Sequence, residues 1–366
     1  MNDDQLTTQG SVDLLYERYR RSERDSRLRG LYYGVKPLLP RRVQLAIRRA
    51  YVPLQRRHGF PAWPIETALV DHQNDEFRRR IMELDADGLA FVGFWPDHRR
   101  FCFVLTHDVE GPAGIENVER LLEVERRHGV TSSWNFVAED YHIPDDLFDH
   151  IRGAGCEIGL HGIHHDDELF RDRRGFEQQL PLIEEYLRKW DAVGFRSPAT
   201  HRYADWMHEL PCTYDSSFPD TDPFEPFPGG CCSIFPFFFG RVVELPITLV
   251  QDHTLFEILR EKSINHWLLK SRWIARNHGL VNVIVHPDYM VDDQRLERYE
   301  ELLRHLVDQD GGWHALPHQV AQWWIQRARL SVETSADRSP VVAGPSDYCA
   351  SVAYARVEDG RVVFAL

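Results

Sequence analysis

Strand-like and helix-like segments alternate along most of this chain, from Phe101 to about residue 330. Short apolar runs predict strands at residues 101–105, 131–137, 157–160, 192–196, 242–245 and 281–285 and around Tyr214 and Trp313. Longer stretches with helical spacing predict helices at 117–128, 175–190, 264–277, 293–306 and 318–329. Such alternation is typical of parallel strands covered by helices, so the chain is predicted to be an α/β protein with a (β/α) barrel.

Metal-binding side chains stand at the ends of two of these strand-like runs. The run from Phe101 ends in Asp108-Val109-Glu110, and the run from Glu157 ends in His161, with His165 four residues later. Two imidazoles and one carboxylate bind a borderline ion such as Zn²⁺ and leave one coordination position open, while the second carboxylate remains as a base. Because catalytic groups of (β/α) barrels lie where strands end, this pattern predicts a hydrolase.

The histidine spacing alone is weak support. A chain with 19 His is expected to contain about one His-x-x-x-His by chance. This chain has a second such pair, His314 and His318, with Pro317 between them and no acidic strand end nearby in the sequence. We interpret that second pair as a turn entering a helix.

Charge is unevenly distributed along the chain. The net charge is −14, yet residues 17–57 contain 13 Lys and Arg against 3 Asp and Glu. The acidic remainder argues against nucleic acid as a substrate. The sequence has no apolar run of membrane-span length and no secretory pattern at its start, and its six scattered Cys fit reduced thiols, so a cytoplasmic location is expected.

We expect three parts in the chain. Residues 1–98 are predicted to form a basic helical arm and linker, residues 99–330 the barrel, and residues 331–366 a tail with a β-hairpin turning at Glu358-Asp359-Gly360. The aromatic loop 218–239 is too long for a simple connection, so it either borders a cleft or folds over its own apolar side chains.

Five segments then occur in a fixed order, and these are Thr106-His-Asp-Val-Glu110, His161-Gly-Ile-His-His165, Arg196-Ser-Pro198, Asp215-Ser-Ser217 and Ile284-Val-His-Pro287. Their order and spacing resemble the five motifs of the polysaccharide deacetylases, the NodB-homology group of carbohydrate esterase family four. The resemblance covers residues 100 to 330. It implies a distorted, incomplete (β/α) barrel and metal-dependent removal of an acetyl group from an N-acetylated sugar of a polysaccharide or glycan precursor.

The resemblance also implies a metal-binding set. His161 and His165 would be ligands of a divalent cation, expected to be Zn²⁺, and Asp108 would be the general base. Most members of the family carry two adjacent Asp, whereas this chain has Val109 in the second place. A subgroup with Asp-x-Asp makes Glu110 the third ligand. The reverse assignment, with Asp108 as ligand and Glu110 as base, stays open because Zn²⁺ accepts either carboxylate.

Four further residues receive roles from the same resemblance. His286 would be the general acid, and the backbone N–H of Ala199 would stabilise the oxyanion. Arg196 would hold Asp108 ionised, and Asp215 would either pair with Arg196 or tune His286.

Two other functions remain open from the sequence. One is hydrolysis of another C–N bond on the same fold, as in the allantoinase-like relatives that work without a metal. The other is a glycan-binding module without catalysis, which the substitution at Val109 and the aromatic loop motivate.

The basic arm poses a separate question. On a helical wheel, one side carries Val43, Ala46, Ile47, Ala50 and Leu54, and the opposite side carries Arg41, Arg42, Arg48, Arg49 and Arg56. Such a helix either lies on the inner face of an anionic membrane and presents a lipid-linked sugar, or packs its apolar side on the barrel. We favour packing on the barrel, because Pro53 limits the length of the helix.

Overall fold

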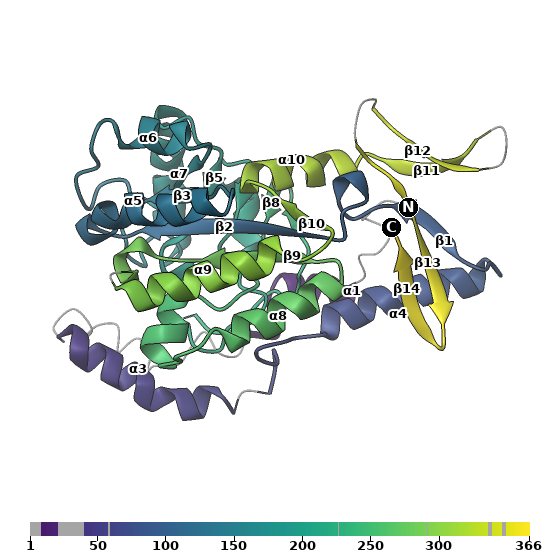
Figure 1. The fold of residues 1–366 in the computed structure, drawn as a ribbon, viewed down its shortest axis with the longest axis horizontal. Helices are drawn as coiled ribbons and strands as arrows, with labels where there is room; N and C mark the ends of the chain where they lie inside the picture. The colour runs from purple at the N-terminus through teal and green to yellow at the C-terminus, as the bar shows by residue number, and fades with distance from the viewer. Residues whose placement is uncertain are drawn as a thin grey trace.

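The computed structural model describes residues 9–20, 40–57, 59–225, 227–290, 292–335, 339–345 and 349–366. Within these residues, a curled sheet of nine strands forms an incomplete barrel with helices outside it (Figure 1). The strand order is β10-β2-β3-β4-β5-β6-β8-β7, with β9 paired to β2, and each pair is parallel except β7 with β8. The distorted (β/α) barrel predicted from the sequence is therefore confirmed.

The strands of the barrel are short apart from β2, which is buried along its whole length. It lies inside the sheet, where β3, β9 and β10 pair with its edges, and α8 packs against it. They are β2 (Phe101–Val109), β3 (Ser133–Phe136), β4 (Glu157–Leu160), β5 (Gly194–Phe195), β6 (Tyr214–Asp215), β7 (Phe237–Phe239), β8 (Val242–Glu244), β9 (Leu280–Ile284) and β10 (Gly312–His314).

Helices begin where the sequence supplies start signals. Pro112 and Pro317 occupy first-turn positions, and the side chains of Asp172 and Asp292 cap α7 and α9. The barrel helices are α5 (Pro112–Arg127), α6 (Leu147–Gly153), α7 (Arg173–Lys189), α8 (Asn265–Arg276), α9 (Asp293–Val307) and α10 (Pro317–Arg327), and the short turns are η4 (Pro96–His98), η5 (Pro198–Thr200), η6 (Ala204–Glu209), η7 (His253–Ile258) and η8 (Pro287–Tyr289).

The barrel closes through irregular backbone after β8. The amides of Thr248 and Leu249 both donate to the carbonyl oxygen of Asn282 in β9, at 3.1 and 3.0 Å. In the aromatic loop 218–239, Phe218, Phe224 and Phe239 are buried, and the rings of Phe218 and Phe239 lie 5.0 Å apart, which agrees with a loop folded over its own apolar side chains.

A second, three-stranded sheet lies at the end of the barrel where β2 begins. Its strands β1 (Leu89–Val92), β13 (Val352–Glu358) and β14 (Arg361–Ala365) are antiparallel, and α4 (Ala68–Glu83) packs on it (Figure 1). The hairpin turns at Asp359 and Gly360, which both have positive φ. A separate pair, β11 (Ser331–Thr334) and β12 (Pro340–Ala343), precedes the hairpin. Because β1 pairs with β13, part of the predicted N-terminal arm and linker folds together with the C-terminal hairpin.

Before α4, the structure describes α1 (Gln9–Leu15), η2 (Arg18–Arg20) and α3 (Arg41–Gln55). Residues 1–8 and 21–39 of the predicted basic arm lie outside the described residues. Our preferred packing for residues 41–56 was wrong: Val43, Ile47 and Leu54 are exposed, whereas Arg48 and Arg49 contact the barrel. None of the described helices is both long and apolar enough to cross a membrane.

Candidate metal centre

The end of β2 places two carboxylates on one side. Side chains alternate along a strand, so Asp108 and Glu110 point the same way while Val109 between them is fully buried in the opposite direction. The backbone N–H of Glu110 donates to Oδ2 of Asp288, at 2.9 Å. This contact fixes the chain where β2 ends.

The loop after β4 brings two histidines to the same place. His161 follows Leu160 directly, and its Nδ1 donates to the carbonyl oxygen of Arg196 at 3.1 Å, which leaves Nε2 as the free lone pair. The chain then turns at Gly162, whose φ is +74°. The backbone N–H of His165 donates to Asp140 at 2.6 Å and so anchors the second histidine.

Glu110, His161 and His165 converge. One ligand atom from each lies within 4.8 Å of the other two. Nε2 of His161 is buried without a hydrogen-bond partner among the described residues, and Nε2 of His165 lies 2.9 Å from Oε1 of Glu110. Two imidazoles and a carboxylate that share one point, with a buried nitrogen left unsatisfied, fit a divalent cation such as Zn²⁺.

Two members of this cluster, His161 and Glu110, have the charge state that a cation requires. Burial lowers the pKa of His161 to about 4 despite the nearby carboxylates, so this imidazole is neutral, as a metal ligand must be. Burial alone would raise the pKa of Glu110, but His165, His286 and His161 outweigh it and hold this pKa well below its usual value. Glu110 is therefore ionised and available as a ligand.

Asp108 is held as a carboxylate beside this cluster. Its Oδ1 accepts hydrogen bonds from Nη1 of Arg196 at 3.2 Å and from Nδ2 of Asn135 at 2.9 Å. Burial would raise the pKa of Asp108, but the Arg196 guanidinium, His161, His286 and Asn135 together hold it below its usual value. Arg196 is itself fixed by Ser216 and by Oγ1 of Thr106, the latter at 2.8 Å.

His286 lies on the other side of Glu110, with its Nε2 3.6 Å from Oε1 of that carboxylate. Its Nδ1 binds Oδ1 of Asp252 at 2.6 Å, and its backbone N–H donates to Oδ2 of the same residue at 3.0 Å. Burial would lower the pKa of His286, but Asp252, Glu110 and Asp108 outweigh it and raise the pKa to about 10. The imidazole therefore carries a proton that points toward the cluster.

The structure gives Asp215 different partners from the two expected for it. Because side chains alternate along β6, Ser216 faces Arg196 while Asp215 faces the other way. The carboxylate of Asp215 accepts from Oγ and N of Ser217, at 2.8 and 3.0 Å. Burial raises the pKa of Asp215 above its usual value, although the hydrogen bonds with Glu244 and Ser217 act in the opposite direction. Asp252, and not Asp215, is the residue that binds His286.

Ala199 follows β5 in the short turn η5. Both Ala199 and Thr200 adopt positive φ, +49° and +52°, and the carbonyl oxygen of Thr200 accepts from Nη1 of Arg202 at 2.9 Å. The turn is thus a backbone conformation that L residues rarely adopt, and a buried arginine holds it.

Asn135, Asp252 and Asp288 are among the polar residues of this centre that were not identified from the sequence. Asn135 lies on β3, and a single polar residue within a strand gives no recognisable sequence signal. Asp252 lies just before η7, outside any motif. Asp288 follows His286 by two residues, and this proximity was the one available signal. The competing pair does not converge on a shared point: His314 binds the carbonyl oxygen of Thr131, and His318 pairs with Glu157.

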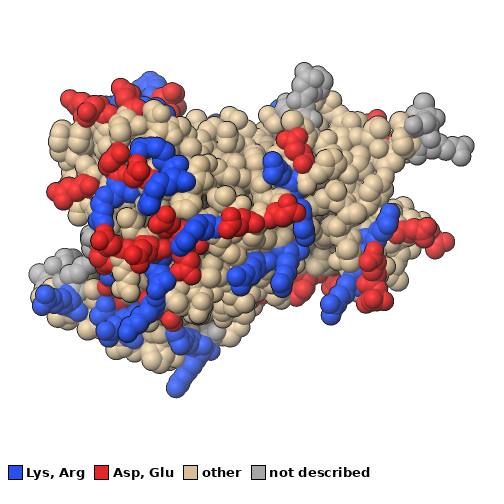
Figure 2. Space-filling model, in the orientation of Figure 1, with Lys and Arg blue, Asp and Glu red and all other residues tan. Residues whose placement is uncertain are grey.

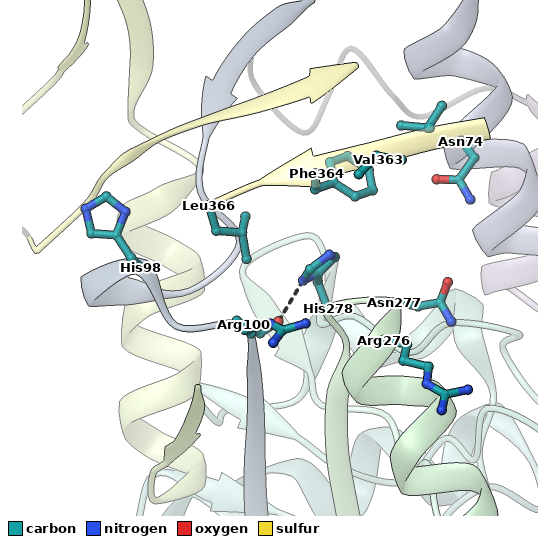
Figure 3. A pocket seen from close by; sticks show the side chains of 10 residues that line it. Asn74, His98, Arg100, Arg276, Asn277, His278, Val363, Phe364 and Leu366 are labelled. Carbon is teal, nitrogen blue, oxygen red and sulfur yellow. Dashed lines mark hydrogen bonds between the residues drawn. The ribbon is translucent and has the colours of Figure 1, made fainter. Parts of the chain in front are cut away.

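A pocket of about 590 Å³ lies away from this centre, at the opposite end of the barrel (Figure 3). It is lined by side chains that include Arg100, just before β2, and His278, just before β9, whose Nδ1 binds the carbonyl oxygen of Arg100 at 2.9 Å. Since the metal-binding cluster lies beyond the other ends of these strands, this pocket is separate from it.

Comparisons with known proteins bear on the fold. No protein-family model and no curated protein matches the sequence. Among solved structures, a Mycobacterium smegmatis protein assigned as a polysaccharide deacetylase matches 64% of this chain and 93% of its own, at 19% identity and a TM-score of 0.53. A Pseudomonas aeruginosa PAO1 protein with the same assignment matches at 16% identity over 63% and 92% of the two chains, with a TM-score of 0.48. PuuE allantoinase matches at 14% identity over 63% and 92%, also with a TM-score of 0.48. The match to the Mycobacterium smegmatis protein, with its TM-score above 0.5, shows that the barrel of this chain has the polysaccharide deacetylase fold.

Proposed function

We propose that this protein is a metal-dependent hydrolase that removes an acetyl group from an N-acetylated sugar of a polysaccharide or glycan precursor. The observation that carries the proposal is the convergence of Glu110, His161 and His165 within 4.8 Å, with the ionised Asp108 and the protonated His286 beside them. The resemblance of the five sequence motifs and the shared fold support the same reaction.

In this proposal Glu110, His161 and His165 hold a divalent cation, most simply Zn²⁺. The cation would supply an activated water and polarise the carbonyl of the acetamido group. Asp108 accepts the proton of the attacking water, because Arg196 and Asn135 keep it ionised and oriented at neutral pH. The alternative, with Glu110 as base, is less favoured because Glu110 Oε1 faces both His165 and His286.

The leaving amine needs a proton, and His286 is placed to give it. Asp252 holds the imidazole through Nδ1 and leaves Nε2 directed at the cluster. The backbone N–H of Ala199 would stabilise the negative charge that develops on the carbonyl oxygen, and the turn held by Arg202 would keep that N–H in position.

Metal content and acetate release test the proposal together. His161→Ala should lose bound metal, measured by elemental analysis of the purified protein. Asp108→Asn should keep the metal but release acetate from N-acetylglucosamine oligomers at least about 100-fold more slowly, since the base is removed. The matched control is His164→Ala, because His164 lies in the same motif but binds Asp140 instead of the cluster.

Other outcomes identify the alternatives. Purified protein that lacks stoichiometric metal and stays active in the presence of a chelator would favour an allantoinase-like hydrolase of another C–N bond. Saccharide binding with no turnover under zinc, nickel or cobalt would favour a glycan-binding module. Unchanged acetate release by Asp108→Asn would refute the assignment of the base.

A further inference from the structure

Helix α3 turns its apolar side to solvent. The exposed fractions of Val43, Ile47, Tyr51 and Leu54 are 41%, 42%, 50% and 48%. Ala46 and Ala50, between them on the wheel, are also exposed. Positions spaced by three and four residues share one face, so these six side chains form a continuous apolar stripe along the helix. We call this stripe the outer face of α3.

Polar contacts hold the opposite side of α3 on the barrel. Nη2 of Arg48 donates to the carbonyl oxygen of Phe224 at 3.0 Å, and Nε of Arg49 donates to that of Glu257 at 2.8 Å. The buried Gln55 donates to the carbonyl oxygen of Pro223 at 2.8 Å. A helix of a globular protein normally buries its apolar side, so α3 has the orientation of a helix whose apolar partner is another surface.

The charge around the outer face indicates which surface that is. Residues 26–65 contain nine Lys and Arg and no Asp or Glu. Arg42 flanks the outer face at its start, and Arg57 follows its last residue. Both are exposed, as is Arg56, which lies on the opposite side of the wheel. Figure 2 shows basic side chains along the lower left edge of the molecule, where Figure 1 places α3. Two copies packed face to face would bring these like-charged arginines close together, so the pattern favours an anionic partner over a second copy.

The outer face also lies near the candidate metal centre. Helix α3 packs on η7, and η7 begins one residue after Asp252, the residue that binds His286. Arg49 contacts η7 directly through Glu257, which also accepts from Arg295 at the start of α9. A surface bound by α3 would therefore lie at the same end of the barrel as the metal-binding cluster.

We propose that the outer face of α3 docks on an anionic phospholipid bilayer, with its apolar side chains among the acyl chains and the flanking Arg42 and Arg57 at the headgroups. An amphipathic helix that combines an apolar face with arginines binds such interfaces through buried apolar area and charge attraction together. This docking does not depend on the reaction. Taken with the proposed function, on which this step rests, it places the substrate sugar at or near a membrane surface.

Flotation with lipid vesicles tests the docking on the full-length protein without added substrate. Wild-type protein should bind vesicles of equimolar phosphatidylglycerol and phosphatidylcholine, and should bind pure phosphatidylcholine vesicles at least about tenfold more weakly. Ile47→Asp should weaken binding to the anionic vesicles by on the order of tenfold or more, because a charge replaces an inserted side chain. The matched control is Leu182→Asp on α7, where the replaced side chain is also 42% exposed, and it should bind like wild type.

Three results would overturn the proposal. They are no binding of wild-type protein to anionic vesicles, equal loss in both variants, or a change in oligomeric state by Ile47→Asp without any change in vesicle binding. The last result would assign the outer face to a second copy. Acetate release from soluble oligomers is a separate measurement, so failure of the docking and failure of the proposed function are distinguishable.

Discussion

Asp108 depends on neighbours that lie on other strands, and the sequence gives no sign of their arrangement. The sequence motifs contain Asp108, Glu110, His161, His165 and His286, and the structure places these five side chains close together. Asn135 and Asp252 bind Asp108 and His286 but belong to no motif, because a hydrogen-bond partner needs proximity in space alone. Asp215 shows the converse, since its position in a motif did not reveal which way its side chain points on β6.

Gly159 leaves the space in which Asn135 binds Asp108. A Cβ at residue 159 would lie 2.0 Å from Oδ1 of Asn135. We expect Gly159→Ala to displace the amide, remove one donor from Asp108 and slow acetate release by on the order of tenfold, with metal content retained. Gly153→Ala is the control, because nothing lies within 4 Å of a Cβ there. Steady-state kinetics would measure acetate release, and elemental analysis would measure bound metal. Full activity of Gly159→Ala would show that the hydrogen bond from Asn135 to Asp108 is dispensable.

At the level of elements, the sequence predicted the repeating strands and helices well because hydrophobic periodicity reports local burial. It did not predict how peripheral elements dock. A helical wheel shows which residues of α3 share a side but not which side meets the barrel, and the contacts that decide this are to backbone carbonyl oxygens of the loop 223–224 and of η7. The pairing of β1 with β13, separated by some 260 residues of chain, likewise has no local signal.

The α1–η2 segment is another peripheral element, and a buried ion pair is among the contacts that attach it. Glu17 accepts from Nη2 and Nε of Arg202, at 2.6 and 3.0 Å, and Arg202 in turn holds the turn that contains Ala199. Glu17→Gln leaves the buried guanidinium without its counter-charge, so we expect a loss of about 3 kcal/mol in the free energy of unfolding. Asp13→Asn is the control: its pair with Arg18 is partly exposed, and the expected loss is below about 1 kcal/mol.

The same pair predicts the sign of a pH effect. Burial would raise the pKa of Glu17, but Arg202 and Arg20 outweigh it and lower this pKa in the folded state. The folded protein then binds fewer protons here than the unfolded chain, so the stabilisation is present above the usual carboxylate pKa and is lost as pH falls through the folded value. Urea unfolding at several pH values should show the difference between wild type and Glu17→Gln shrinking toward acid pH, and a constant difference would contradict this origin.

Across the whole molecule, the last strand joins parts of the chain that are far apart in sequence. The ring of Phe364 in β14 lies 5.2 Å from that of Phe77 in α4, 5.6 Å from that of Phe91 in β1 and 5.4 Å from that of His278 before β9. One aromatic side chain thus links the helix, the small sheet and the barrel, at the end of the barrel away from the metal-binding cluster.

Phe364→Ala should therefore lower the free energy of unfolding by about 2 to 4 kcal/mol, since the partly buried ring, which lines the pocket, would no longer pack against these three parts. Val363→Ala, on the same strand but 41% exposed, should cost less than about 1 kcal/mol. Because the candidate metal ligands lie at the other end of the barrel, folded Phe364→Ala should still bind metal in the wild-type ratio. Denaturant unfolding measures the free energy of unfolding, and elemental analysis of the folded protein measures its metal content. If folded Phe364→Ala bound less metal than wild type, the two ends of the barrel would be energetically coupled. Our inference that the aromatic cluster and the metal-binding cluster are independent would then be wrong.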